Sequence, residues 1–467
     1  LKKEKCPDRS KDENVFDIRQ GVAIALFIKK QGKKGCKVYH SARWGLRDKK
    51  YEWLQKNDIK KTKWKRLSPK SEPYFFIPRD ERLLEAYERF PKISDIFPVN
   101  SVGIVTSRDS FVIDPDKDVL KRRIKIFRDE KMPDDIVRQT FKMKDKSNWE
   151  LKTAREKIRK DEKWEDSITN ILYRPFDMQW VFYHDAVIER SRKEVMKHMM
   201  QENLSLCVGR AGQVVGIDKP WNIVFCSNYI EDFNLFYRGG NVNFPLYLYP
   251  KKDNPQKRSS GSTLMLFEPP AEYVSRTPNL SPNIVNLLIK SFGKKAPTPE
   301  EIFFYVYAIL YSNIFRTKYA EFLRSDFPRV PFTKKLELFS NMATHGKRLA
   351  QLHLFQSSDL NPPIAKFRGK GEGIVEKLRY DISERRVFFN QSQYFEGISN
   401  DVWEYQIGGY QVCHKWLKDR RGRTLSTDDI KHYCRIATAI QKTIEIQKNI
   451  DRIYPEVEKR TIVFEDI

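Results

Sequence analysis

The sequence predicts a mixed α/β protein made of several domains. Its 467 residues are more than one compact core usually holds, and 40% of them are hydrophobic, enough to form a real interior. Stretches with the alternating or continuously apolar pattern of strands are interspersed with stretches of helical three-to-four spacing. Charged residues make up 32% of the chain with both signs mixed, which argues against wholesale disorder.

The N-terminal region is predicted to form a β-hairpin over residues 14–45. Residues 22–28 (VAIALFI) form a continuously apolar strand, residues 29–35 a basic turn, and residues 36–44 the return strand. A strand that is apolar on both faces is buried inside a larger sheet, and too little chain precedes this one to supply that sheet. We therefore expect the chain to be excised from a longer polypeptide.

The pattern changes twice in the middle of the chain. From about residue 80 to 165 it is helical and highly charged, with amphipathic spacing at 119–127 and a second charged helix at 148–164. Residues 168–250 are strand-like and aromatic, and residues 251–263 have the polar composition of an exposed linker.

Helices return after the linker. They are expected at 284–292 and 299–324, with strands following around 374–394. Ser426 and Asp429 form a capping-box start for the last long helix, whose apolar residues keep a three-to-four spacing.

The charge balance indicates an anionic partner. The 87 Lys and Arg against 62 Asp and Glu give a formal net charge of +25, and such a surplus repels itself in the folded state. It is spread over an aromatic-rich, folded chain, which favours nucleic acid over an acidic protein or a membrane surface. The longest apolar run falls well short of the ~20 residues of a membrane span. Six scattered cysteines without a CxxC pair are typical of free thiols in a reducing cytoplasm.

None of the candidate catalytic or metal-binding patterns has the residues and the spacing that its chemistry requires. Asp116, Asp129 and Lys131 match a metal-nuclease pattern, but a helix-like segment separates acids that this chemistry needs on adjacent strands. Residues 361–364 (NPPI) are similar to the Asn-Pro-Pro-aromatic signature of amino-methyltransferases, but Ile replaces the aromatic residue. Two cysteines and two histidines at 413–434 match no common zinc spacing.

Basic residues interleaved with an aromatic residue predict the nucleic-acid contacts. Residues 414–423 (HKWLKDRRGR) hold five cations and one Trp; Lys and Arg neutralise phosphates or fork onto guanine, and Trp stacks or packs against sugar. A solvated hairpin tip with Trp416 in the core explains this composition equally well. The glycine-bearing loop 369–373 adds Lys370 as a phosphate contact, with a plain surface turn as the alternative. The predicted contacts are Lys370, Lys415, Trp416, Lys418, Arg420, Arg421 and Arg423.

Motifs along the chain resemble one protein family. Residues 14–30 resemble the late strand pair of N6-adenine DNA methyltransferases. Six further motifs occur in the same order in the C-terminal part of Type ISP restriction–modification enzymes, often labelled predicted helicases. They are residues 103–113 (GIVTSRDSFVI), 173–177 (YRPFD), 188–192 (IERSR), 244–250 (FPLYLYP), 325–331 (SDFPRVP) and 407–423 (IGGYQVCHKWLKDRRGR). The resemblance extends over nearly the whole chain.

The resemblance implies a parent polypeptide with a nuclease, a translocating helicase-like ATPase, an adenine methyltransferase and a target-recognition domain, in that order. This chain would hold a remnant of the Rossmann-like methyltransferase sheet, followed by an α/β target-recognition domain with a long C-terminal helix. The implied parts are methyltransferase strands at 1–80, a charged helical connector at 81–165, a strand-rich aromatic segment at 166–262 and the recognition domain at 275–467. By this resemblance, Phe16 stands where related methyltransferases place an aromatic residue against the extruded adenine, although a core role explains it more simply.

The sequence thus predicts sequence-specific recognition of double-stranded DNA, in which Lys and Arg contact phosphates and a few side chains read base edges. The glycine loop for S-adenosylmethionine and the ATPase and nuclease motifs of the family are absent from this sequence. We expect this chain to use no cofactor, whereas the parent uses S-adenosylmethionine, ATP and Mg²⁺. The expected partners are duplex DNA and the upstream methyltransferase, helicase and nuclease parts of the same cytoplasmic polypeptide. The alternatives are a stand-alone methyltransferase or nuclease, and a protein-docking scaffold within the parent.

Overall fold

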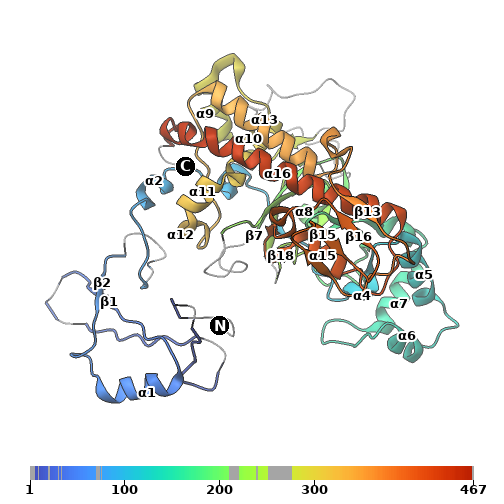
Figure 1. The fold of residues 1–467 in the computed structure, drawn as a ribbon, viewed down its shortest axis with the longest axis horizontal. Coiled ribbons are helices and arrows are strands. Elements are labelled where there is room, and N and C mark those ends of the chain that lie inside the picture. Colours follow the sequence, from blue (N-terminus) through green and yellow to red (C-terminus); the bar gives the residue numbers. More distant parts are fainter. Residues whose placement is uncertain are drawn as a thin grey trace. The chain divides into compact units, whose positions relative to one another are not determined.

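The chain forms two compact units, Leu1–Arg82 and Leu83–Ile467, in the computed structural model (Figure 1). The structure describes residues 6–8, 10–18, 21–29, 31–32, 34–69, 74, 76–209, 220–237, 240–250 and 276–464. Helices and strands both contribute, so the predicted mixed α/β class is confirmed. The predicted linker at 251–263 lies outside the described residues, and the four-part domain division stays a prediction.

The N-terminal unit contains one helix and one two-stranded sheet among its described residues. Strand β1 (Val38–His40) pairs antiparallel with β2 (Lys65–Leu67), and α1 (Arg47–Lys56) lies between them in sequence. Lys50 fixes α1 to the preceding segment, because its buried ammonium lies 2.7 Å from a carboxylate oxygen of Asp12.

The predicted hairpin over residues 14–45 is wrong. The described residues 21–29 form no strand, and β1 pairs with residues 65–67 instead. The apolar side chains expected in a core are exposed, with Ile24 at 84% and Phe27 at 83%. A strand apolar on both faces needs a sheet at its edges and layers over both faces. The described part of this unit supplies neither, and the implied Rossmann-like remnant is not confirmed.

Helices form much of the larger unit. In chain order its described helices are α2 (Leu84–Glu88), α3 (Ile93–Ile96), α4 (Asp109–Val112), α5 (Lys117–Arg128), α6 (Asp134–Thr140), α7 (Leu151–Lys160), α8 (Lys193–Met196), α9 (Pro282–Phe292), α10 (Pro299–Tyr311), α11 (Asn313–Lys318), α12 (Ala320–Leu323), α13 (Leu336–His353), α14 (Asn400–Trp403), α15 (Val412–Lys418) and α16 (Thr427–Lys459). The predicted charged helices appear as α5 and α7, and the predicted last helix as α16.

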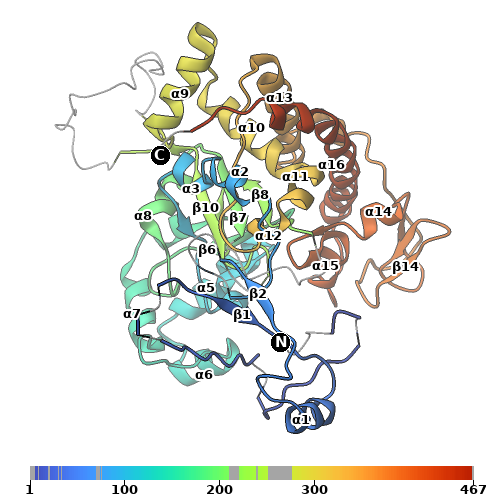
Figure 2. The same cartoon turned by 90° about the vertical axis from the view of Figure 1, so that its left-hand side faces the viewer.

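Helices α10, α13 and α16 pack together in the main core (Figure 2). α16 begins with the predicted capping box, in which Asp429 N donates to Ser426 Oγ at 3.1 Å and Ser426 N donates to Asp429 Oδ2 at 3.0 Å. α10 and α13 approach closely at Gly346, where an added Cβ would lie 1.8 Å from the carbonyl oxygen of Phe304. Only glycine permits this crossing.

The single helix predicted at 299–324 is divided into α10, α11 and α12. Ser312 ends α10 and caps α11, where its Oγ accepts a hydrogen bond from Phe315 N at 3.2 Å. The same hydroxyl donates to Asp451 of α16 at 2.8 Å. A contact with a distant part of the chain therefore stabilises the break, although the local spacing is helical.

Among the described residues, three four-stranded sheets complete the larger unit. The first has the order β3 (Ser101–Val102), β10 (Asn241–Pro245), β7 (Ser205–Gly209), β8 (Val224–Ser227). The second has the order β4 (Ile113–Asp114), β6 (Asp177–Phe182), β5 (Ile168–Arg174), β9 (Ile230–Glu231), with β5 and β9 parallel. The third has the order β13 (Lys366–Arg368), β16 (Tyr394–Glu396), β15 (Arg386–Phe388), β14 (Arg379–Asp381) and is antiparallel. Short pairs join β11 (Tyr247–Leu248) to β12 (Thr277–Pro278) and β17 (Gln406–Ile407) to β18 (Tyr410–Gln411).

Candidate nucleic-acid interface

The two basic segments that the sequence singles out lie side by side. Residues 414–423 form the end of α15 and the turn after it, rather than a hairpin tip. This turn pairs with the chain that follows the glycine-bearing loop: Gly422 N donates to Val375 O at 2.8 Å, and Val375 N donates to Arg423 O at 2.9 Å. The loop 369–373 is thereby held against the turn.

Four predicted contacts are exposed on this surface, namely Lys370, Lys418, Arg421 and Arg423. Within the described parts of the chain, the first three have no ion-pair partner, and Arg423 has only a loose one, 4.0 Å from Asp114. Cations without carboxylate partners are the groups that neutralise DNA phosphates. We call these four residues the basic rim.

The other three predicted contacts, Lys415, Trp416 and Arg420, lie beneath the rim and interact with other residues of the protein. Trp416 is 2% exposed and Arg420 is 6% exposed, and the Arg420 guanidinium lies 3.5 Å from the centroid of the indole ring. Arg420 Nη2 donates to Asp177 of β6 at 2.9 Å, and Lys415 lies 2.5 Å from Asp419. The core position for Trp416, the alternative interpretation of this segment, is the one that the structure shows.

The glycine-bearing loop has a fixed conformation. Ser392 Oγ donates to Lys370 O at 2.9 Å, and Gly373 N donates to Gln393 Oε1 at 2.9 Å. Gly369 has φ +96°, and an added Cβ would lie 2.1 Å from the carbonyl oxygen of Ser392. The backbone of Lys370 is therefore held in place by the turn that precedes β16.

Sequence reasoning missed the residue that anchors this surface. Asp177 anchors the turn, and no local pattern connects it to Arg420. Lys366 and Arg368 are exposed on β13 directly before the loop. Both flank the loop in the sequence, and their alternation about the apolar Phe367 places them on one face of the strand.

The nuclease hypothesis fails on geometry. Asp116 caps the N-terminus of α5, where its carboxylate accepts from the backbone N–H groups of Asp118 and Val119, and Asp129 lies at the other end of the same helix. The helix between them holds 12 residues, so the two acids are about 20 Å apart along its axis. They cannot converge on one metal ion.

In the part of the chain that the structure describes, no cluster of three or more His, Cys, Asp or Glu side chains could hold a metal ion. Cys413 is buried and its thiol lies 3.9 Å from Val402 O. His432 Nε2 lies 2.9 Å from Phe176 O, and burial lowers the pKa of this imidazole. Both residues contribute to packing.

Phe16 belongs to the N-terminal unit. It lies in a bend, where its backbone N–H donates to Asn14 Oδ1 at 3.1 Å, and its ring is half-exposed. The simpler interpretation, in which Phe16 is a core residue, is therefore wrong. Its stacking role stays a prediction from the family resemblance.

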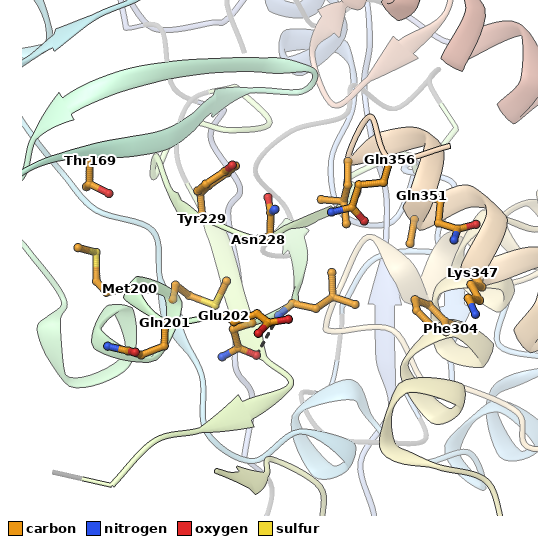
Figure 3. A pocket seen from close by; sticks show the side chains of 15 residues that line it. Thr169, Met200, Gln201, Glu202, Asn228, Tyr229, Phe304, Lys347, Gln351 and Gln356 are labelled. Carbon is orange, nitrogen blue, oxygen red and sulfur yellow. Dashed lines mark hydrogen bonds between the residues drawn. The ribbon is translucent and has the colours of Figure 1, made fainter. Parts of the chain in front are cut away.

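A cavity of about 550 Å³ lies elsewhere in the larger unit and contains none of the predicted residues. Figure 3 shows Gln351, Gln356 and Lys347 on one wall, Met200 and Gln201 on the other, and Asn228 between them. Glu202 is the one carboxylate in the lining. The lining therefore lacks a pair of carboxylates.

Comparisons with known proteins show which protein family this chain matches. Residues 95–449 match the family model of the Type ISP C-terminal specificity domain. No curated protein matches the chain. None of the helices in the described ranges combines the length and apolar character needed to cross a bilayer.

Three solved structures are similar in fold. The first, a nuclease-deletion mutant of the Type ISP restriction-modification enzyme LlaGI in complex with a DNA substrate mimic, has 20% identity and a TM-score of 0.60, with coverage of 90% of this chain and 33% of that one. The DrdV–DNA complex has 19% identity and a TM-score of 0.64, with coverage of 88% and 43%. The ATP-dependent Type ISP enzyme LlaBIII bound to DNA has 20% identity and a TM-score of 0.61, with coverage of 83% and 25%. This chain thus spans less than half the length of each.

Proposed function

The chain belongs to the Type ISP C-terminal specificity domain family, and on this basis we propose that it recognises a specific sequence in double-stranded DNA. In this proposal it is the specificity segment of a restriction–modification polypeptide that acts in the cytoplasm. Its partners are the duplex and the upstream methyltransferase, helicase and nuclease parts of that polypeptide. The three similar structures, which contain DNA or a DNA substrate mimic, support the choice of partner.

The observation that carries the proposal is the basic rim. Lys370, Lys418, Arg421 and Arg423 come from two segments and are presented together, exposed, on a chain of net charge +25. The side chains of the rim contact phosphates and set the register of the protein on the duplex. Lys415, Trp416 and Arg420 act from beneath by fixing the turn that carries the rim.

Phosphate contacts make a specific prediction for salt dependence. The logarithm of the binding constant for B-DNA falls with the logarithm of salt concentration with a slope of about −0.9 for each neutralised phosphate. The triple variant Lys418→Ala, Arg421→Ala, Arg423→Ala is expected to weaken duplex binding and to reduce this slope by about 2 to 3. Fluorescence anisotropy of a labelled duplex across a salt series measures both quantities.

A second triple variant controls for the loss of charge alone. Lys152, Lys157 and Lys160 are exposed on α7, outside the basic rim. Their replacement by Ala removes the same charge and is expected to leave most of the slope intact. Equal slopes for the two triple variants, or no duplex binding at low salt by the unmodified protein, would favour the docking scaffold over DNA recognition.

The cofactors of the parent are proposed to bind outside this chain. Calorimetric titration of the protein with S-adenosylmethionine, or with ATP and Mg²⁺, is expected to release no binding heat. Saturable heat with S-adenosylmethionine would instead favour the stand-alone methyltransferase. Phe16 is proposed to stack against the extruded adenine only where a complete methyltransferase is present.

A further inference from the structure

The sheet β13–β16–β15–β14 has one buried face and one open face. Each strand holds three residues with an apolar or aromatic residue in the middle: Phe367, Phe395, Val387 and Tyr380. Val387 and Phe395 are fully buried, and the Phe395 ring centroid lies 4.3 Å from that of Tyr433 on α16. Because side chains alternate along a strand, the flanking residues of all four strands share the opposite, open face.

The register arranges these flanking residues in two rows across the sheet. Arg379 pairs with Phe388, Phe388 with Tyr394, and Tyr394 with Arg368. In the second row, Asp381 pairs with Arg386, Arg386 with Glu396, and Glu396 with Lys366. The first row therefore has two aromatic rings between two guanidinium groups, and the second alternates acids and cations. We call these eight residues the open face; Lys366, Arg368 and Arg379 are exposed, and the other five are half-buried.

Two of the three arginines of the open face lie against aromatic rings, and one of them, Arg386, also forms an ion pair with Glu384. The Arg379 guanidinium lies 3.8 Å from the Phe388 ring centroid, and that of Arg386 lies 4.8 Å from the Tyr394 centroid. The two rings are themselves 4.9 Å apart. A guanidinium that rests on a ring keeps its planar fork of donors in a defined orientation. Such a fork suits a bidentate contact better than a freely rotating side chain.

The open face also carries acceptors, which a surface for phosphates alone would exclude. Arg368 Nε donates to Glu396 Oε1 at 2.7 Å, and Arg379 lies 3.5 Å from Asp381. Carboxylates repel phosphate but accept a hydrogen bond from the amino group of cytosine, whereas arginine forks onto O6 and N7 of guanine. Donors and acceptors in two fixed rows therefore match base edges better than they match a backbone.

The position of the open face fits this use. β13 leads directly into the loop that carries Lys370, so the open face adjoins the basic rim at the exposed Lys366 and Arg368. The turn between β14 and β15 is exposed, including Ile382 and Arg385 at its tip. A two-stranded ribbon of this kind enters the major groove, which is about 12 Å wide.

We propose that the open face is the surface that reads base pairs in the major groove, with Arg379 and Arg386 reading guanine and Asp381 and Glu396 reading cytosine. This inference rests on the proposed DNA recognition and assigns its specificity-determining residues. The basic rim contributes affinity, and the open face contributes the choice of sequence.

Selection from a randomised duplex library with the full chain tests this division. The unmodified protein is expected to enrich a defined sequence. Arg379→Ala is expected to lose discrimination at a G·C pair of that sequence by about 5- to 150-fold, with the salt slope unchanged. Arg379→Lys keeps the charge but loses the fork, and is expected to lose the same discrimination. Glu396→Gln is expected to relax the preference for cytosine at another position.

Lys418→Ala is the matched control from the basic rim. It is expected to weaken binding to every sequence alike and to lower the salt slope by about 1, without changing the enriched sequence. Circular dichroism and thermal melting confirm that each variant is folded.

The outcomes separate the two proposals. If Arg379→Ala and Glu396→Gln enrich the same sequence as the unmodified protein, the open face does not read bases, and the proposed function stands. If Arg379→Ala weakens all sequences equally and lowers the salt slope, Arg379 is a phosphate contact and the inference is overturned. If the unmodified protein binds no duplex, or enriches no sequence, DNA recognition fails and the inference fails with it.

Discussion

Single buried charges determine how the candidate interface is held. Arg420 joins the turn beneath the basic rim to Asp177, and both side chains are almost fully buried. Asp177 also accepts from Gln179 Nε2 at 2.9 Å, so both of its oxygens are hydrogen-bonded. Removal of one member of such a pair leaves an uncompensated charge in the interior, which costs far more than the pair contributes.

Arg420→Ala is therefore expected to lower the free energy of unfolding by about 3 to 5 kcal/mol. Arg421→Ala removes the neighbouring but exposed cation, and is expected to change the same quantity by no more than about 0.5 kcal/mol. Urea unfolding followed by circular dichroism measures both variants. Similar values for the two would mean that Arg420 does not anchor the turn.

Glu231 is the residue from which a pH dependence is expected. It is fully buried on β9, where it accepts from Ser205 Oγ and Asn243 Nδ2, each at 2.6 Å. Burial raises the pKa of its carboxyl from 4.5 to about 7. The folded protein thus holds a proton that the unfolded chain releases above pH 4.5, so this contribution to stability is complete below that pH and is lost as pH rises to about 7.

Glu231→Gln removes this titration. As pH rises from 4.5 to about 7, the free energy of unfolding of the unmodified protein is expected to fall relative to that of the variant. Above pH 7, the pH profiles of the two proteins are expected to be parallel. Asn243 Oδ1 has no hydrogen-bond partner in the described structure, so it can accept from the new amide after rotation of the Asn243 side chain. Parallel pH profiles throughout would show that Glu231 does not titrate in this range.

At the scale of elements, local sequence signals predicted the helices well. The structure of the other segments depends on contacts that are not encoded locally. The capping box of α16 and the charged amphipathic pattern of α5 were sufficient, because both are encoded within a few consecutive residues. Helix α15 was not predicted, because the basic composition of residues 414–423 was given more weight than the spacing of the apolar residues. Val412, Cys413, Trp416 and Leu417 are buried at helical intervals. The break at Ser312 depends on its contact with Asp451 of α16, and periodicity revealed neither this contact nor the exposure of segment 21–29.

Gly346 makes the close approach of α10 and α13 testable. Gly346→Ala puts a methyl group onto the carbonyl oxygen of Phe304, so the two helices must separate. The free energy of unfolding is expected to fall by about 1 to 3 kcal/mol, as in other overpacked cores. Thr344→Ala, at an exposed position of the same helix, serves as the control in thermal unfolding. An unchanged melting temperature for Gly346→Ala would argue against this crossing.

At the scale of the whole molecule, the ordered motifs predicted the family, the charge predicted an anionic partner, and local composition singled out the cations of the candidate site. The sequence did not predict that the loop 369–373 and the turn after α15 meet, because the Ile374–Thr424 bridge joins residues far apart in the chain. It also did not predict the open face of the third sheet, since only the register of four short strands aligns those side chains.

The division into two units predicts an autonomous fragment. Residues 83–467 contain both apolar cores, the whole basic rim and the residues that match the family model. This fragment is expected to unfold cooperatively and to bind duplex DNA with the salt slope of the full chain. Calorimetry and anisotropy measure these properties. A fragment that melts without cooperativity, or loses the salt dependence, would show that residues 1–82 are required.

The exposed apolar segment near the N-terminus has a consequence for the protein in concentrated solution. Residues 22–28 carry no charge and no proline, are rich in β-forming side chains, and form no strand with another described segment. A stretch of this kind is a template for pairing with the same stretch of another molecule. We therefore expect aggregation to begin at this segment and to limit solubility under conditions in which the globular core is still folded. Ile24→Lys is expected to delay this aggregation.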